Sequence, residues 1–221
     1  MKTISIILPI NNPEMLSQAD LALYQSADCY FKLSYVDTAL RELKSASDVE
    51  QIFPLVLNRI VEAEQAGAAA VVVYAFGDVA IKEGKDLVSI PVMGLGKAAV
   101  NMASLLCRRH YTVLPSMLGH AGFINAMVEE EGVGHRFIPA SHGIEVSPAQ
   151  LKGNPAVLGQ LIEIADFEIR EKGVDTFTLG CGGFIGVGKK LEAALRAKHQ
   201  LAITVIDPVS VALGLAKALI E

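Results

Sequence analysis

Short apolar stretches alternate with longer segments of helical periodicity along this chain. Several of the stretches are continuous apolar runs, a pattern typical of parallel strands that are covered on both faces. The predicted strands are Thr3–Leu8, Tyr30–Val36, Ala69–Tyr74, Ile90–Gly94, Tyr111–Leu114, Arg136–Ile138, Asp175–Leu179 and Ala202–Ile206. Because helical patterns lie between these strands, the sequence predicts an α/β fold.

Two of the predicted helices have recognisable ends. One is expected to begin near Ser47, which stands at capping-box spacing from Glu50. Pro54 lies inside this helix and predicts a kink or a later start. A second helix is expected to follow the cap residue Asn154 and to end at Gly173.

The two halves of the chain share landmarks at a constant spacing. Four pairs of equivalent residues are each 106 positions apart, namely Pro9 and Pro115, Phe31 and Phe137, Gly67 and Gly173, and Gly77 and Gly183. We infer two similar α/β halves, a first domain of residues 1–97 plus 208–221 and a second of residues 98–207. The spacing lengthens to about 113 at Pro91 and Thr204, which predicts an insertion around 186–200.

Composition and charge exclude several classes of protein. Hydrophobic residues make up 52% of the chain and charged residues 19%, which excludes low-hydrophobicity disorder. The longest apolar runs, such as Ala68–Phe76, are shorter than the ~18 residues of a membrane-spanning helix, so we expect no membrane segment. A net charge of −5 without a Lys/Arg block makes nucleic acid an unexpected partner.

The opening segment and the cysteines indicate in which compartment of the cell the protein is expected. The opening run Lys2–Ile10 is interpreted as a buried strand, because no small-residue cleavage site follows it. Cys29, Cys107 and Cys181 are odd in number and lack metal-ligand spacing, which suits a reducing cytoplasm. Cys29 and Cys107 are interpreted as packing residues.

Cys181 is the strongest candidate for chemistry. It follows a predicted strand and is surrounded by glycines, and ligands of parallel α/β sheets bind outside the carboxyl ends of the strands. Glycine N–H groups can approach an anion closely, and donors near a helix N-terminus favour the thiolate. The alternative interpretation is a small buried residue in a glycine turn.

The repeat places Ala75 at the position equivalent to Cys181. Two thiols on opposite faces of a carbon acid can invert its stereocentre, one removing a proton as thiolate and the other returning one. Here the equivalent thiol is missing. Since the sequence shows no pyridoxal lysine motif and no metal cluster, we expect any such chemistry to need no cofactor.

Four motifs resemble, in order, those of the aspartate/glutamate/hydantoin racemase superfamily, and most closely its hydantoin racemase branch. The likeness covers nearly the whole chain. The motifs are Phe76-Gly77-Asp78, Ile90-Pro91-Val92-Met93-Gly94-Leu95-Gly96-Lys97-Ala98-Ala99, Leu179-Gly180-Cys181-Gly182-Gly183 and Asp207-Pro208-Val209.

The resemblance implies two pseudo-symmetric αβα halves, each with a parallel four-stranded sheet, and an active site in the cleft between them. It implies cofactor-independent chemistry on a small-molecule carboxylate or ring amide, and we also expect a homo-oligomer. The family places a cysteine in both strand-end loops, and these positions fall on Ala75 and Cys181. The substrate-binding residues that it implies are Asn11, Phe76, Gly77, Asp78, Ser116, Gly182 and Gly183.

Other polar residues near the strand ends have two interpretations each. Asn11 and Asn12 contact substrate or form a turn, and Ser116 binds a substrate oxygen or caps a helix. Asp207 orients substrate or caps the final helix, while Lys97 occupies a position where the family often has an acidic or amide residue. The loop histidines His120 and His142 are candidates for a replacement acid, or are simply solvated.

Three explanations fit the alanine at position 75. It replaces a catalytic cysteine in an engineered variant, it is natural and another group supplies the second acid, or the chain resembles the arylmalonate decarboxylase branch, which keeps only the second cysteine. Phe76-Gly77-Asp78 resembles the racemase loop more than the decarboxylase loop. A different class of function, a ligand-binding protein that has lost catalysis, also stays open.

Overall fold

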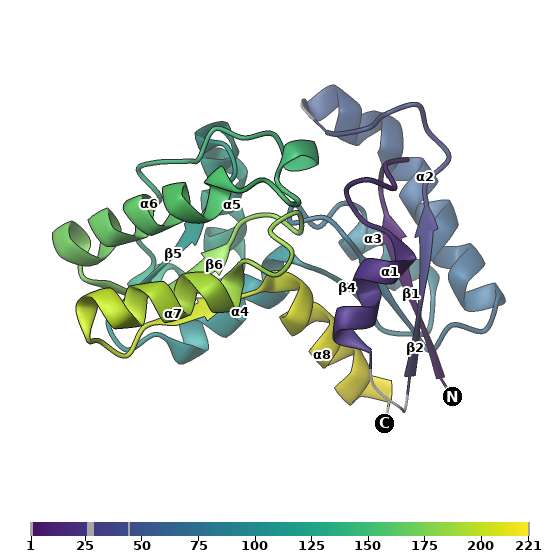
Figure 1. The fold of residues 1–221 in the computed structure, drawn as a ribbon. Coiled ribbons are helices and arrows are strands. Elements are labelled where there is room, and N and C mark those ends of the chain that lie inside the picture. The colour runs from purple at the N-terminus through teal and green to yellow at the C-terminus, as the bar shows by residue number, and fades with distance from the viewer. Residues whose placement is uncertain (1, 26–28, 44, 221) are drawn as a thin grey trace. The chain divides into compact units, whose positions relative to one another are not determined.

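The computed structural model describes residues 2–25, 29–43 and 45–220, in which helices and strands alternate (Figure 1). The strands are β1 (Lys2–Leu8), β2 (Cys29–Tyr35), β3 (Ala70–Val73), β4 (Val92–Gly94), β5 (His110–Leu114), β6 (Val174–Leu179) and β7 (Thr204–Ile206). The α-helices are α1 (Gln18–Leu21), α2 (Ala46–Gln65), α3 (Ile81–Leu87), α4 (Gly96–Leu106), α5 (Ala121–Glu130), α6 (Ala156–Lys172), α7 (Gly188–His199) and α8 (Pro208–Ile220). Short 3-10 helices occur at Ala22–Tyr24, Leu118–His120, Gly134–Arg136 and Pro148–Gln150.

The chain divides into two compact units. The first unit comprises residues 1–95 and 209–221, and the second unit comprises residues 96–208. In the first unit the strand order is β2-β1-β3-β4, and in the second it is β5-β6-β7. All neighbouring strands are parallel, which confirms the predicted α/β class.

The sheet of the second unit has three strands, so the prediction of a fourth strand at Arg136–Ile138 is wrong. Only an isolated bridge between Tyr111 and Phe137 remains there. The Ile138 N–H donates to the Tyr111 carbonyl at 2.9 Å, and the Ile138 carbonyl accepts from the Thr112 hydroxyl at 2.7 Å. The 3-10 helix Gly134–Arg136 ends directly before Phe137, so the segment runs along β5 only for the length of this bridge.

The repeat predicted from the sequence is confirmed in the order of the strands. The bridge at Phe137 lies on the β5 side, just as β2 lies on the β1 side, so the two units share one strand order. Gly67 and Gly173 follow α2 and α6 with φ of +82° and +67°, a conformation that favours glycine. The predicted insertion coincides with α7, which has 12 residues where α3 has 7.

The first unit has its core between its sheet and the helices α2 and α3. Helix α2 presents a face of buried residues every three or four positions, namely Ile52, Val56, Ile60 and Ala63. Helix α3 lies close to α2, because a Cβ on Gly84 would come within 2.7 Å of the Ile60 side chain. Helix α8 returns to this unit, where the Lys217 amine donates to the Tyr24 carbonyl at 2.6 Å (Figure 1).

Two helix starts can be compared with their predictions. Helix α2 is capped by Ser45, whose side chain accepts from the Asp48 N–H, so the predicted cap at Ser47 and the later start after Pro54 are both wrong. The two boxes have the same spacing, and Ser45 comes two residues earlier. Helix α6 begins at Ala156 after Pro155, one residue later than expected, and the Asn154 side chain accepts from the Ala156 N–H at 3.0 Å.

Among the residues that the structure describes, no helix is both long enough and apolar enough to span a bilayer.

Candidate active site

The carboxyl ends of β5 and β6 bring two of the predicted site residues into neighbouring loops. The last residues of these strands, Leu114 and Leu179, are paired in register. The Gly180 N–H then donates to the Leu114 carbonyl at 2.8 Å. A Cβ on Gly180 would lie 2.9 Å from Val113 and 3.1 Å from the Pro115 Cα, so glycine permits this approach. Ser116 and Cys181 thus follow adjacent strand ends.

Cys181 is buried at the start of its loop, with 8% of its surface exposed. Its Sγ accepts a hydrogen bond from the Gly183 N–H at 3.4 Å. Burial raises the pKa of the Cys181 thiol to about 11, and the Gly183 N–H opposes this only in part. The Gly183 N–H thus favours the thiolate in the expected direction, but burial of the charge has the larger effect, so the thiol form of Cys181 predominates at neutral pH.

Ser116 is fully buried in the loop that follows β5. Its carbonyl accepts from the Val146 N–H at 3.1 Å, whereas its Oγ has no hydrogen-bond partner among the described residues. Ser116 therefore does not act as a helix cap. A buried hydroxyl without a partner is costly, and a ligand oxygen is one group that can satisfy it.

In the first unit, Ala75 is the second residue after β3 and is partly exposed. Its carbonyl accepts from the Asp78 and Leu95 N–H groups at 3.3 and 3.4 Å. Phe76 is buried, with 6% exposed, while Gly77 is exposed and has open space where a side chain would lie. The loop is thus folded back onto the end of β4.

Asp78 holds an unusual position in this loop. Its φ of +50° lies in the left-handed region, which is uncommon outside glycine. Its Oδ1 lies 2.1 Å from the place that a Cβ on Gly94 would occupy, so the carboxylate fills the space that this glycine leaves open. Asp78 therefore packs against the end of β4.

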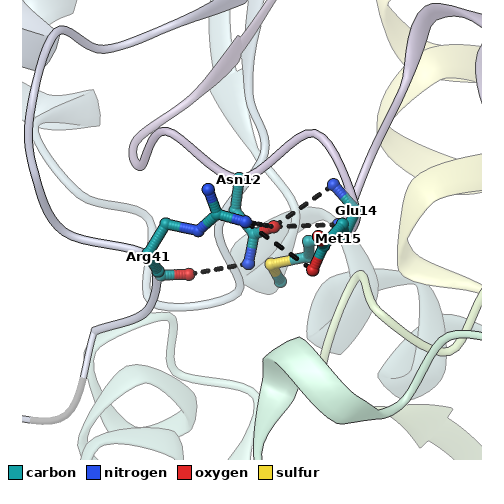
Figure 2. A network of polar contacts seen from close by, with 4 residues as sticks. All are labelled: Asn12, Glu14, Met15 and Arg41. Atoms are coloured by element: carbon teal, nitrogen blue, oxygen red, sulfur yellow. Dashed lines mark hydrogen bonds and ion pairs between the residues drawn. The ribbon is translucent and has the colours of Figure 1, made fainter.

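The two asparagines after β1 differ in role. Asn12 is buried; its Nδ2 donates to the Arg41 carbonyl at 2.9 Å, and its Oδ1 accepts from Glu14, Met15 and the Arg41 guanidinium (Figure 2). Asn12 therefore forms a turn with Glu14 and Met15 and links this turn to Arg41. Asn11 is exposed and only its main-chain N–H is bound in this turn, to Leu40.

Lys97 and Asp207, the two charged candidates, both lie against other parts of the fold. Lys97 forms ion pairs of 2.8 and 3.0 Å with Glu130 and Glu131, and the hydrogen bond that its amine donates to the Glu130 carboxylate is the largest cause of the raised pKa of that amine. Asp207 is half-buried between β7 and the first residue of α8. The Lys97 amine is therefore paired with Glu130, the last residue of α5, and with Glu131, which follows it.

The two histidines occupy different surroundings within the second unit. His120 is half-buried and lies against the Phe123 ring, and burial lowers the pKa of its imidazole while nearby Glu145 opposes the shift. His142 is exposed and rests edge-on against the Phe167 ring of α6 at 5.0 Å. His142 thus packs on a helix, whereas His120 lies in the 3-10 helix that follows the Ser116 loop.

Cys29 and Cys107 are buried and form no disulfide among the described residues, in agreement with their interpretation as packing residues. Within the described residues, no three His, Cys, Asp or Glu side chains are grouped as metal ligands would be. Gly182 and Gly183, the two residues that follow Cys181 in the sequence, are buried. A Cβ on Gly183 would lie 2.9 Å from the Pro148 carbonyl.

Sequence reasoning did not single out the segment from Gly143 to Leu151, which packs against both strand-end loops of the second unit. The available signals were weak. Gly143 and Pro148 mark a loop, but nothing in the pattern assigns that loop to the site.

Known proteins with related sequences support the resemblance inferred above. The family model described as Asp/Glu/hydantoin racemase matches residues 16–216. A hydantoin racemase of Rhizobium meliloti is 25% identical over 221 residues, covering 98% of this chain and 88% of the relative. A hydantoin racemase of Paenarthrobacter aurescens is 28% identical over 153 residues, covering 68% of this chain and 61% of the relative, which is less than two thirds of that protein.

Solved structures show the same fold at low sequence identity. Allantoin racemase from Klebsiella pneumoniae superposes with a TM-score of 0.88 and 20% identity, covering 100% of this chain and 88% of that one. Unliganded arylmalonate decarboxylase gives a TM-score of 0.65 and 15% identity, with 100% and 94% coverage. With the match of the family model over most of its length, the chain belongs to the Asp/Glu/hydantoin racemase family, and this membership supports a racemase function.

Proposed function

We propose that the protein is a cofactor-independent isomerase that moves the proton on a carbon next to a ring-amide or carboxylate carbonyl, with Cys181 as its acid/base thiol. The observation that carries the proposal is the position of this thiol at the carboxyl end of β6, bound to the Gly183 N–H. The relatives described as hydantoin racemases and the structure described as an allantoin racemase support a ring amide as the substrate class.

The proposed step is a proton transfer from carbon to sulfur. The Cys181 thiolate takes the α-proton, the C–H electron pair moves into the carbonyl to form an enolate, and the thiol then returns a proton to carbon. The Ser116 Oγ, which has no partner among the described residues, is available to donate to the enolate oxygen. Inversion needs a proton from the opposite face, which the methyl group of Ala75 cannot give; it then depends on another donor, such as His120 or Asp78, and we expect it to be slower than exchange.

This assignment is tested with optically pure 5-substituted hydantoins, allantoin, aspartate and glutamate in D₂O. We expect deuterium to enter at the stereocentre of one ring-amide class faster than optical rotation is lost, because one thiol exchanges protons from one face. Exchange is followed by NMR and rotation by polarimetry, each corrected for the uncatalysed rate. If none of these compounds exchanged faster with the protein than without it, the proposed function would be refuted.

The pH dependence follows from the protonated resting state of Cys181. With its pKa at about 11, the thiolate is about one thousandth of the total at pH 8. When proton abstraction limits the rate, kcat/KM for exchange is therefore expected to rise roughly tenfold per pH unit between pH 7 and 9. A profile that stays flat over this range would contradict the thiolate as the abstracting base.

A lone protonated thiol also favours a second candidate, decarboxylation of an arylmalonate. There the C–CO₂ bond breaks, CO₂ leaves, and the Cys181 S–H protonates one face of the enolate that remains. Since the buried thiol is already in its acid form, this rate is expected to be independent of pH up to about 9. Release of CO₂ with an optically active product would favour this candidate over the isomerase.

A further inference from the structure

A loop of the second unit, residues 143–151, joins the surroundings of Ser116 to those of Cys181; we call it the strap. It lies between α5 and α6 and contains the 3-10 helix Pro148–Gln150. Ile144 and Leu151 anchor it in the core, with 5% and 1% of their surfaces exposed. The strap is therefore a packed element of the second unit.

One end of the strap is fastened to the loop after β5. The Glu145 carboxylate accepts from the Leu118 N–H at 2.8 Å, and the Val146 N–H donates to the Ser116 carbonyl at 3.1 Å. Glu145 adopts a φ of +53°, in the left-handed region that side chains rarely adopt. A Cβ on Gly143 would lie 2.5 Å from the Leu118 nitrogen, so only glycine allows the strap to pass this close to the Leu118 main chain. At this end of the strap, the close contacts with the loop after β5 therefore coincide with a left-handed backbone conformation at Glu145.

The other end of the strap lies against the Cys181 loop. A Cβ on Gly183 would come within 2.9 Å of the Pro148 carbonyl and 3.1 Å of the Leu151 side chain. Leu151 is tied to the start of α6 by its carbonyl, which accepts from the Asn154 N–H at 3.2 Å. The residue that donates to Cys181 is therefore confined by the strap on one side.

From these contacts, we propose that the strap positions the Cys181 thiol: Leu151 and the Pro148 carbonyl hold Gly183 where its N–H meets Sγ, and Glu145 anchors the strap at the Ser116 loop. Leu151 is in this account a positioning residue, which acts through Gly183. The inference rests on the proposed function only in taking Cys181 as the reactive group, and its geometry lies wholly within the second unit.

The arrangement predicts how the thiol responds when the strap is loosened. Shortening Leu151 to alanine removes packing from the face of Gly183 and opens room for water near Sγ. Burial is the larger cause of the raised thiol pKa and the Gly183 N–H the smaller, opposing one. Loosening should therefore lower the pKa of Cys181, and each unit by which it falls gives about tenfold more thiolate at pH 8.

The test measures alkylation of Cys181 by iodoacetamide between pH 7 and 11, with the modified cysteine located by mass spectrometry. Leu151→Ala is expected to react about tenfold faster than the unchanged protein at pH 8, with its profile moved to lower pH. Leu151→Met, which keeps the volume, should restore the original profile. Leu161→Ala removes an equally buried leucine from α6 and is the matched control, expected to leave the profile unchanged.

Two results would overturn the inference. One is a Leu151→Ala profile equal to that of the unchanged protein. The other is the same shift in Leu161→Ala, which would mean general loosening of the unit. Should Leu151→Ala fail to fold, Glu145→Met replaces it; this variant keeps nearly the same side-chain length, removes the oxygen that accepts from the Leu118 N–H, and must raise the rate at pH 8 at least threefold. Alkylation needs no substrate, so these outcomes are independent of whether any hydantoin is turned over.

Discussion

Replacing Cys181 by serine is expected to lower the rate of proton exchange by about 10² to 10⁴-fold, the usual contribution of a general acid–base group. Serine has nearly the same size, and its hydroxyl is too weak an acid to carry a proton to or from carbon at neutral pH. Binding should change little, because Cys181 is buried with 8% of its surface exposed and the loop shape is kept by its glycines. The loss should therefore appear in kcat.

Cys107→Ser is the matched control for this variant. Cys107 is also a buried free thiol of the second unit, and its Sγ contacts the Ser104 carbonyl at 3.4 Å. Its serine variant should keep the full exchange rate. Full turnover by Cys181→Ser, measured with the same substrate and in the same deuterated buffer, would show that sulfur at position 181 takes no part in the chemistry.

Introducing cysteine at position 75 is expected to raise the rate of racemisation by about 10²-fold or more, at the lower end of what an added acid–base group contributes. The repeat places Ala75 where Cys181 stands in the second half, and the loop presents Ala75 partly exposed. Its backbone is held by the Asp78 and Leu95 N–H groups, so a small side chain can be exchanged without moving the loop.

The informative quantity is the ratio of inversion to exchange. In Ala75→Cys this ratio should approach that of a two-base racemase, whereas in the unchanged chain exchange should exceed inversion. Ala75→Ser is the control, because it adds a group of similar size without an acidic thiol. Equal racemisation in the unchanged chain and in Ala75→Cys would contradict the role given to position 75 and would direct attention to His120 or Asp78.

Most of the fold could be predicted from the sequence, since buried parallel strands leave apolar runs and the two halves repeat the same landmarks. The fourth strand of the second unit could not. The segment around Phe137 has the apolar pattern of a strand, but a 3-10 helix occupies Gly134–Arg136 directly before it, and its contact with β5 is limited to the bridge at Tyr111. The hydrophobic pattern alone does not show where such a turn ends and how long the pairing that follows it is.

The candidate site was predicted in part. The positions of Cys181 and Ser116 follow from the rule on strand ends, whereas the protonation state of the thiol does not, because it depends on burial by residues distant in sequence. Asn12 shows the same limit: a turn-forming pair is visible in the sequence, but its bond to Arg41, 29 residues away, is not. The strap was missed for this reason too.

The most direct test of the account compares the unchanged protein with Cys181→Ser in D₂O, on one optically pure 5-substituted hydantoin, following deuterium at the stereocentre by NMR and optical rotation in the same sample. We predict rapid deuterium incorporation with slower loss of rotation in the unchanged protein, and rates of both that are lower by about 10²-fold or more in Cys181→Ser. Deuterium incorporation at the same rate in both proteins would contradict the claim that the Cys181 sulfur carries the proton.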